Sequence, residues 1–256
     1  MTAQPANSQR TNPWLIIPAP RPAARLRLIC FHHAGGGAHA YRDWDKNLPC
    51  SIEVAAVQFP GRGVRLAEQP LTSVDAVLPC LMDALVPALS KPFVFFGHSM
   101  GALIAFEVTR SLRRLRKTLP VHLFVSGRGG PPKRDWHVNF SELSDEDLLV
   151  ELERYGGAPK EVLEHTELMR LMLPTIRADF KVCETYNYVP EEPLDCPISA
   201  YGGLEDFEVK QERLEAWRDE TLPAFNLRMF PGGHFYFQKS EHSILQSILK
   251  DLQHAF

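Results

Sequence analysis

Residues 97–101 read GHSMG and match the pattern G-x-S-x-G, in which the central serine can act as a nucleophile. The apolar residues 93–96 before them suit a buried strand, and a helix-compatible run follows from 102 to 117. A tight turn between such a strand and helix exposes the Oγ atom of Ser99 at the helix N-terminus, where the backbone amide of Met100 can stabilise a negative charge. We therefore predict that Ser99 is a nucleophile. The alternative is an ordinary strand-to-helix turn.

A serine nucleophile needs a histidine base that takes its proton and a carboxylate that orients the histidine. In enzymes with this serine motif the chain order is serine, carboxylate, histidine. Of the ten histidines, His234 alone lies on a glycine-flanked loop directly after a late predicted strand. Asp206 follows another predicted strand in a glycine-rich loop, with Glu205 beside it as the second choice. We predict His234 as the base and Asp206 as the acid. The alternatives are a histidine and a carboxylate on solvated surface loops.

The elements that must position these residues alternate between strands and helices. We expect strands at 26–31, 52–59, 93–96, 121–125, 198–201 and 227–230, and helices at 73–89, 102–117, 211–220 and 243–252. Pro79 lies inside the first of these helices and predicts a kink or a late start there. The proline-rich residues 14–24 are expected to be extended. Such alternation is typical of a mostly parallel sheet covered by helices on both faces.

The pattern changes between residues 141 and 188, where no convincing strand occurs and helical spacing dominates. Ser144 has the features of a helix N-cap, the two glycines at 156–157 end that helix, and 161–186 is mostly helical with Pro174 as a break. The longer helix carries an apolar stripe at Leu168, Leu171, Met172, Ile176 and Phe180. We predict a helical lid over the active-site face. The alternative is a helical subdomain that only packs the core.

Composition limits the compartment and the partners of the protein. The chain of 256 residues is 45% apolar and carries a formal net charge of −3, so we do not expect nucleic acid as a partner. Five scattered cysteines with no C-x-x-C pair indicate reduced thiols in a cytoplasm, not a disulfide frame or a zinc site. No apolar run approaches the length of a membrane span, and the N-terminus lacks the core of a signal peptide. We expect a monomeric cytoplasmic protein.

The sequence divides into four segments on these patterns. We expect a disordered tail at 1–13, a first part of the α/β core at 14–135, the helical lid at 136–190 and a second part of the core at 191–256. The glycine-rich residues 32–37 follow the first strand, where a serine hydrolase places a second donor for an oxyanion. A flexible turn or a phosphate-binding loop is the alternative, although no phosphate-binding pattern is present.

Several blocks of the sequence together resemble one known family. They are LICFHHAGGG (28–37), VQFPGRGVR (57–65), FFGHSMGALIAFE (95–107), YGGAPKEVLE (155–164), LPTIRADF (173–180), AYGGLED (200–206) and FPGGHFYF (230–237). The chain is similar in these blocks to the type II thioesterases that accompany polyketide synthases and non-ribosomal peptide synthetases. Two positions depart from the family pattern, because His32 and Phe207 stand where proline is usual.

The resemblance implies an α/β-hydrolase fold with a helical lid and a triad of Ser99, Asp206 and His234. It implies that Ala34 supplies the second oxyanion amide beside Met100. The implied activity is hydrolysis of aberrant or stalled acyl groups from the phosphopantetheine arm of an acyl or peptidyl carrier domain. This chemistry needs no metal or organic cofactor.

Two sets of residues are candidates for contacts with the substrate and its carrier. Leu168, Met172 and Ile176 are expected to face the acyl chain. Arg62 and Arg65, on a loop after a strand, could steer an acidic carrier domain. A second basic stripe, at Arg110, Arg113, Arg114 and Lys117, lies at the end of its helix away from the serine, so we weight it less. Either set could serve the fold instead.

Three other functions remain open on the sequence alone. A general carboxylesterase or lipase would share the triad and would hydrolyse oxyesters faster than thioesters. A product-releasing or acyl-transferring thioesterase would pass the acyl group to an alcohol or amine. A non-catalytic module that binds carriers would not react with a serine-directed fluorophosphonate.

Overall fold

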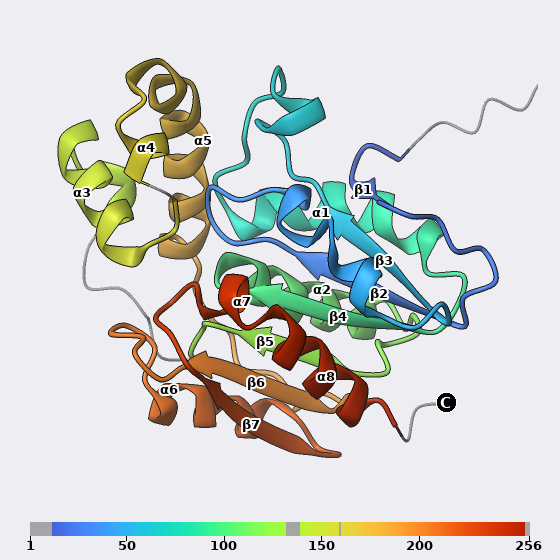
Figure 1. Cartoon of the computed structure of the whole chain (residues 1–256). Coiled ribbons are helices and arrows are strands. Elements are labelled where there is room, and N and C mark those ends of the chain that lie inside the picture. Colours follow the sequence, from blue (N-terminus) through green and yellow to red (C-terminus); the bar gives the residue numbers. More distant parts are fainter. Residues whose placement is uncertain (1–11, 132–138, 159, 254–256) are drawn as a thin grey trace, which may run out of the picture.

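The computed structural model describes residues 12–131, 139–158 and 160–253. In these residues one sheet of seven strands runs in the order β1-β3-β2-β4-β5-β6-β7 (Figure 1). Its strands are β1 (Leu15–Ile16), β2 (Leu26–Phe31), β3 (Ile52–Val57), β4 (Phe93–His98), β5 (Leu123–Ser126), β6 (Ile198–Gly203) and β7 (Phe225–Phe230). All neighbours pair in parallel except β1, which pairs antiparallel with β3. The predicted α/β class is confirmed.

The central strands form because their residues are apolar on both faces. Every residue of β3, β4, β5 and β6 is buried, which is the pattern of parallel strands covered by helices on both sides. The outermost strand β7 is half-buried over most of its length. The extended segment expected near the N-terminus contributes only the two residues of β1, with Leu15 opposite Val57.

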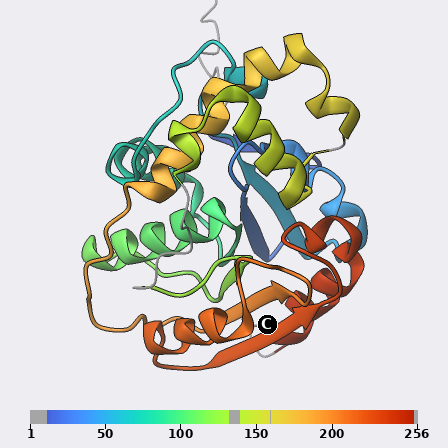
Figure 2. The ribbon, with the colours of Figure 1, turned by 90° about the vertical axis from the view of Figure 1, so that its left-hand side faces the viewer.

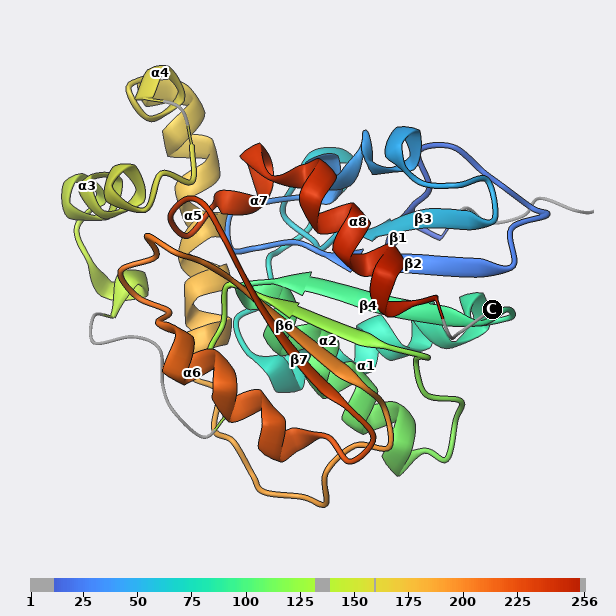
Figure 3. The same cartoon turned by 60° about the horizontal axis from the view of Figure 1, so that its bottom comes forward.

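Helices cover both faces of the sheet and create two cores (Figure 3). One face is packed by α1 (Val74–Leu85), α2 (Met100–Arg114) and α6 (Gln211–Glu215), and the other by α7 (Tyr236–Lys239) and α8 (Glu241–Asp251). The α1 helix begins at Val74, where the Ser73 side chain accepts a hydrogen bond from the amide of Ala76. Pro79 lies inside this helix, which excludes a late start and leaves the kink a prediction.

Three helices, which we call the lid helices, stand over the carboxyl ends of the strands, α3 (Asp145–Tyr155), α4 (Lys160–Leu163) and α5 (Thr166–Glu184). Figure 2 looks onto this end of the sheet, and the three helices (yellow to gold) lie across its upper part. The predicted ends of α3 are confirmed, because Ser144 caps its first turn and Gly156, with a φ of 70°, follows its last residue. Of the four predicted segments, the tail at 1–13 lies mostly outside the described residues, and so does the boundary between 135 and 136, so all four segments remain predictions.

The prediction that Pro174 breaks the second lid helix is wrong. The α5 helix continues through Pro174 from Thr166 to Glu184. Proline removes the hydrogen bond to the carbonyl four residues earlier, which belongs to Arg170. Both residues are on the exposed side of α5, so water can satisfy that carbonyl. The break falls instead before Thr166, where the ring of His165 accepts a hydrogen bond from the amide of Leu168.

Candidate active site

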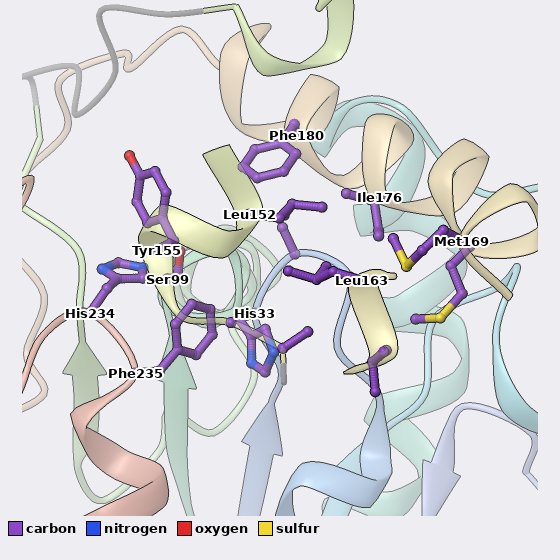
Figure 4. Close-up of a pocket in the computed structure, with 16 residues that line it drawn as sticks. His33, Ser99, Leu152, Tyr155, Leu163, Met169, Ile176, Phe180, His234 and Phe235 are labelled. Carbon is purple, nitrogen blue, oxygen red and sulfur yellow. The ribbon is translucent and has the colours of Figure 1, made fainter. Parts of the chain in front are cut away.

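Ser99 occupies a strained turn between β4 and α2. Its φ is 54° and its ψ is −114°, a conformation that serine rarely adopts. The turn also needs its two glycines, because a Cβ atom on Gly97 would lie 2.2 Å from the carbonyl oxygen of Gly101, and one on Gly101 would lie 2.0 Å from that of Phe31. Ser99 therefore stands at the N-terminus of α2, where it lines a chamber beneath the lid (Figure 4).

His234 and Asp206 meet at the same chamber, 28 residues apart in the sequence. The Nδ1 atom of His234 lies 2.8 Å from Oδ2 of Asp206, so the ring N–H donates to the carboxylate and Nε2 is left to accept a proton. The other carboxylate oxygen accepts hydrogen bonds from the amides of Glu208, at 2.9 Å, and Val209, at 3.1 Å. Burial alone raises the pKa of Asp206, but these hydrogen bonds and the imidazole outweigh it and lower the pKa below its usual value.

Glu205, the second choice for the acid, is not at this site. Glu205 is exposed, whereas Asp206 is buried and bonded to His234. The position after the acid holds Phe207, which packs against Tyr155 of the lid with ring centroids 5.0 Å apart. The guanidinium of Arg154 lies 4.4 Å from the centre of the Phe207 ring. The aromatic residue at this position therefore connects the loop of the acid to α3.

A second serine–histidine pair lies below the chamber. The Nδ1 atom of His98 is 2.8 Å from Oγ of Ser126, which is also 2.5 Å from the hydroxyl of Tyr236. His98 and Ser126 have no exposed surface, and neither lines the chamber. Burial lowers the pKa of His98 far below its usual value, so this ring is neutral. A substrate cannot reach this pair, which ties β4, β5 and α7 together instead.

The glycine-rich loop after β2 forms the chamber wall beside Ser99. Ala34 and Gly35 line the chamber, and Gly35 has a φ of 73°, which favours glycine. The His33 ring lines it too, and burial and the nearby His234 lower its pKa to about 3, so it is neutral at pH 7. The amide of Gly35 donates to the carboxylate of Asp179 on α5, 2.7 Å away. Sequence reasoning gave no role to His33 or Asp179.

The chamber itself is small and mostly apolar, with a volume of about 80 Å³. Besides Ser99, His234 and the loop, its walls come from the lid and from Phe235 (Figure 4). The lid residues lining it include Leu152, Tyr155, Leu163, Met169, Met172, Ile176 and Phe180. Met172 and Ile176 thus lie where they were predicted.

Leu168, which was predicted to face the acyl chain, does not line this chamber. Leu168 is 37% exposed and lines a neighbouring cavity of about 440 Å³ on the other side of α5, as does Leu171. The inner face of α5 carries Met169, Met172 and Ile176, and Leu168 lies at the edge of this face, about 40° from Met172 and about 100° from Met169. Met172 and Ile176 line both cavities and separate them.

The arginines predicted to dock a carrier are buried, so that prediction is wrong. Arg62 forms a two-point ion pair with Asp179, with N–O distances of 2.5 and 2.7 Å. Arg65 lies 4.1 Å from the centre of the Trp14 ring and donates to the carbonyl of Gln58 and to Glu68. Both guanidinium groups are held by the fold and leave no basic surface on this loop.

The second basic stripe is largely neutralised as well. Arg110 is buried and pairs with Glu107 at 2.5 Å, and Arg113 pairs with Glu191 at 2.5 Å. Arg114 bonds to Glu191 too, whereas Lys117 is exposed and forms no ion pair with any residue that the structure describes. These contacts attach the end of α2 to the segment after α5. They indicate a structural role for the stripe.

Two further observations concern cofactors and membranes. Within residues 12–131, 139–158 and 160–253, His, Cys, Asp and Glu side chains form no group of three or more that could hold a metal ion. None of the helices in those ranges combines the length and hydropathy of a membrane span.

Comparisons with known proteins identify the family of the chain. Residues 26–256 match the family model described as a thioesterase domain. The chain is 42% identical to the gramicidin S biosynthesis protein GrsT of Aneurinibacillus migulanus, covering 95% of both chains. It is 37% identical to the thioesterase PikA5 of Streptomyces venezuelae, covering 97% of this chain and 88% of that one. The structure of the type II thioesterase BorB from the borrelidin biosynthetic cluster superposes with a TM-score of 0.86 at 38% identity, covering 93% of this chain and 97% of that one.

Proposed function

The chain belongs to the thioesterase family, as a type II thioesterase of polyketide and non-ribosomal peptide biosynthesis, and we propose that it uses Ser99, His234 and Asp206 to hydrolyse acyl groups from carrier domains. The observation that carries this proposal is the hydrogen bond between His234 and the buried Asp206 beside a serine in a strained turn. Their side chains come from three loops. Ser99 and His234 line the chamber, and Asp206 supports His234 through its hydrogen bond.

In the proposed reaction, Nε2 of His234 takes the proton of Ser99 as Oγ attacks the thioester carbonyl. The backbone amides of Met100 and Ala34 stabilise the oxyanion, aided by the N-terminus of α2. The carbon–sulfur bond then breaks, and the pantetheine thiolate leaves and takes up a proton. Water activated by His234 attacks the acyl-serine and releases the free acid. Asp206 holds the histidine in the required tautomer throughout.

The substrate in this proposal is an acyl unit on the phosphopantetheine arm of a carrier domain, removed as a misprimed or stalled group. Every proposed catalytic group comes from one chain, which supports a monomer as the active form, and the cytoplasm is the proposed compartment. Hydrolysis rates on a panel of acyl-carrier thioesters, matched acyl-CoAs and matched oxyesters test this. We expect the carrier thioesters to react fastest. An oxyester preference would indicate a general esterase, and a product formed with an added alcohol or amine in place of water would indicate an acyltransferase.

The chamber volume favours short acyl groups. An engineered protein cavity of about 150 Å³ holds one benzene molecule, so about 80 Å³ suits an acyl group of a few carbons. A longer chain has to displace Met172 or Ile176 to enter the larger neighbouring cavity. We therefore propose that Met172 and Ile176 limit the length of the acyl chain, while Leu168 contacts only a chain that passes them.

Substitutions of Met172 should change the preference for chain length. We expect Met172→Trp to lower the kcat/KM for octanoyl thioesters at least about tenfold more than for acetyl thioesters, and Met172→Ala to shift the preference toward octanoyl. Arg170→Trp is the control, because it adds an indole to the same helix at an exposed side chain that lines neither cavity. Equal losses on both chain lengths that follow a fall in melting temperature would mean that Met172 only packs the core.

A further inference from the structure

We propose that Arg62 and Asp179 are positioning residues for the oxyanion loop, an inference that rests on the proposed function. Three blocks of the sequence, 28–37, 57–65 and 173–180, supply none of the three triad residues. The fold brings them to one point, where Asp179 of α5 lies between Gly35 and Arg62. Arg62 and Asp179 are 117 residues apart, and both are more than nine-tenths buried.

The contacts at this point fix the loop on both sides of Gly35. Oδ2 of Asp179 accepts the N–H of Gly35 at 2.7 Å, which orients the peptide that joins Ala34 to Gly35. Nη1 of Arg62 donates to the carbonyl of Gly36 at 3.1 Å, which orients the peptide that joins Gly36 to Gly37. A carboxylate and a guanidinium thus hold a loop of three consecutive glycines that has few conformational restraints of its own.

Arg62 is completely occupied by this arrangement. It makes five hydrogen bonds, two to Asp179, two to the carbonyl of Pro60 and one to that of Gly36, which equals the number of its N–H donors. The guanidinium also balances the charge of Asp179. Without that balance, a buried carboxylate bonded to Gly35 would repel the negative charge that develops on the substrate oxygen beside Ala34.

Stability alone is a weak reason for such a pair. Taking two charges out of water costs about as much as their attraction returns, and apolar pairs of the same size are often at least as stable. An oxyanion hole, in contrast, works only if its donors are already aimed at the oxygen before the reaction. The geometry therefore assigns the pair to the orientation of the Ala34 amide, whose N–H belongs to the peptide directly before the one that Asp179 holds.

The α5 helix also contacts this loop through Ile176, a residue that lines the acyl chamber. A Cβ atom added to Gly35 would lie 3.0 Å from Cγ1 of Ile176, one turn before Asp179 on α5. Ile176 faces the chamber in Figure 4. The wall that meets the acyl chain and the carboxylate that holds the oxyanion loop are thus parts of one helix.

The test compares Asp179→Ala and Asp179→Asn with Thr175→Val in kinetics on an acetyl-carrier thioester. Thr175 is the matched control, because its buried hydroxyl joins α5 to the carbonyl of Gly61, next to Arg62, without touching Gly35. We expect Asp179→Ala to lower kcat about 10²-fold, the loss typical of one oxyanion donor, with KM changed less than about threefold. Asp179→Asn, which keeps an acceptor for Gly35, should recover part of that loss. Thr175→Val should keep kcat within about threefold even if its melting temperature falls.

A second readout separates positioning from structure. An alkylthio trifluoromethyl ketone forms a tetrahedral adduct with an active-site serine and places its oxygen in the oxyanion hole. For each variant, the inhibition constant of this ketone should rise by about the same factor by which kcat/KM falls. A loss of kcat/KM with an unchanged inhibition constant would overturn the inference, and so would a kcat of Asp179→Ala within about threefold of the parent.

A double variant covers the case in which Asp179→Ala does not fold. Arg62→Met combined with Asp179→Leu leaves no unpaired buried charge, so we expect it to fold and to lose kcat and ketone affinity about equally. A folded double variant with parental kcat would also overturn the inference. The proposed function fails separately, since it requires Ser99→Ala to be inactive. If Ser99→Ala is inactive and the double variant is fully active, the positioning role alone is wrong.

Discussion

Replacing Ser99 by alanine is expected to reduce thioester hydrolysis by about 10⁵-fold or more, because the attacking oxygen is lost and only binding and the oxyanion donors remain. The residue would still have a positive φ of 54°, which alanine tolerates no better than serine, so the melting temperature should stay close to that of the parent. The measurement is single-turnover release of acetate from an acetyl-carrier thioester, with circular dichroism to verify the fold.

His234→Ala should be about as severe, and the double variant with Ser99→Ala should be no worse than either single one, because the two residues act as a unit. Ser126→Ala is the control, since that serine bonds to a different histidine in the closed interior below the chamber. We expect it to change stability more than turnover. Full activity of Ser99→Ala, or inactivity of a well-folded Ser126→Ala, would contradict the assignment of the nucleophile.

Replacing Asp206 by asparagine is expected to lower kcat about 10⁴-fold. The amide of asparagine can donate to Nδ1 of His234, which would place the proton on Nε2, the nitrogen that has to accept the proton of Ser99. The shape of the site would barely change, because asparagine has the size of aspartate. Steady-state rates on the acetyl-carrier thioester measure the effect.

Glu205→Gln is the matched control for Asp206→Asn. It removes the same charge one residue earlier in the same loop, on a side chain that is exposed. We expect its rate to stay within about twofold of the parent. A near-parental rate of Asp206→Asn combined with a large loss in Glu205→Gln would mean that the loop presents the other carboxylate during catalysis.

Features that depend on neighbouring residues in the sequence were predictable. The turn at Ser99 follows from sterics, since only glycine fits at 97 and 101 when the strand and helix pass so closely. The cap at Ser144 and the glycine after α3 are local as well. Uninterrupted apolar runs predicted the buried parallel strands. The chain order of serine, acid and histidine selected Asp206 and His234, which the fold does bring into hydrogen-bond contact.

Features that depend on distant partners were not predictable. Arg62 reads as a loop cation until Asp179, on a helix 117 residues away, is known to face it. Arg113 and Arg114 read as a solvated face until Glu191 is known to lie against them. The sequence does not show whether a charged side chain is buried, because its burial depends on the partner that the fold brings to it.

A third feature that the sequence does not predict is the rotation of a lid helix about its own axis. Leu168 and Met169 are both apolar, and a pattern of apolar residues on α5 fits a face containing either one. The packing of α5 against the loop at Gly35 decides the matter and turns Met169 inward. Pro174 was misjudged for the same reason, since its effect depends on whether the freed carbonyl faces water.

The central claim is that thioester hydrolysis passes through an acyl-enzyme on Ser99. The most direct measurement is to mix the protein with one equivalent of acetyl-carrier thioester, quench in acid within milliseconds, and map the acetyl group by peptide mass spectrometry. We predict a transient mass increase of one acetyl group on the peptide that contains Ser99, formed before acetate appears and absent in Ser99→Ala. An acetyl group found on Ser126 or on another residue, or acetate released with no acyl-enzyme even when His234→Ala slows deacylation, would contradict the claim.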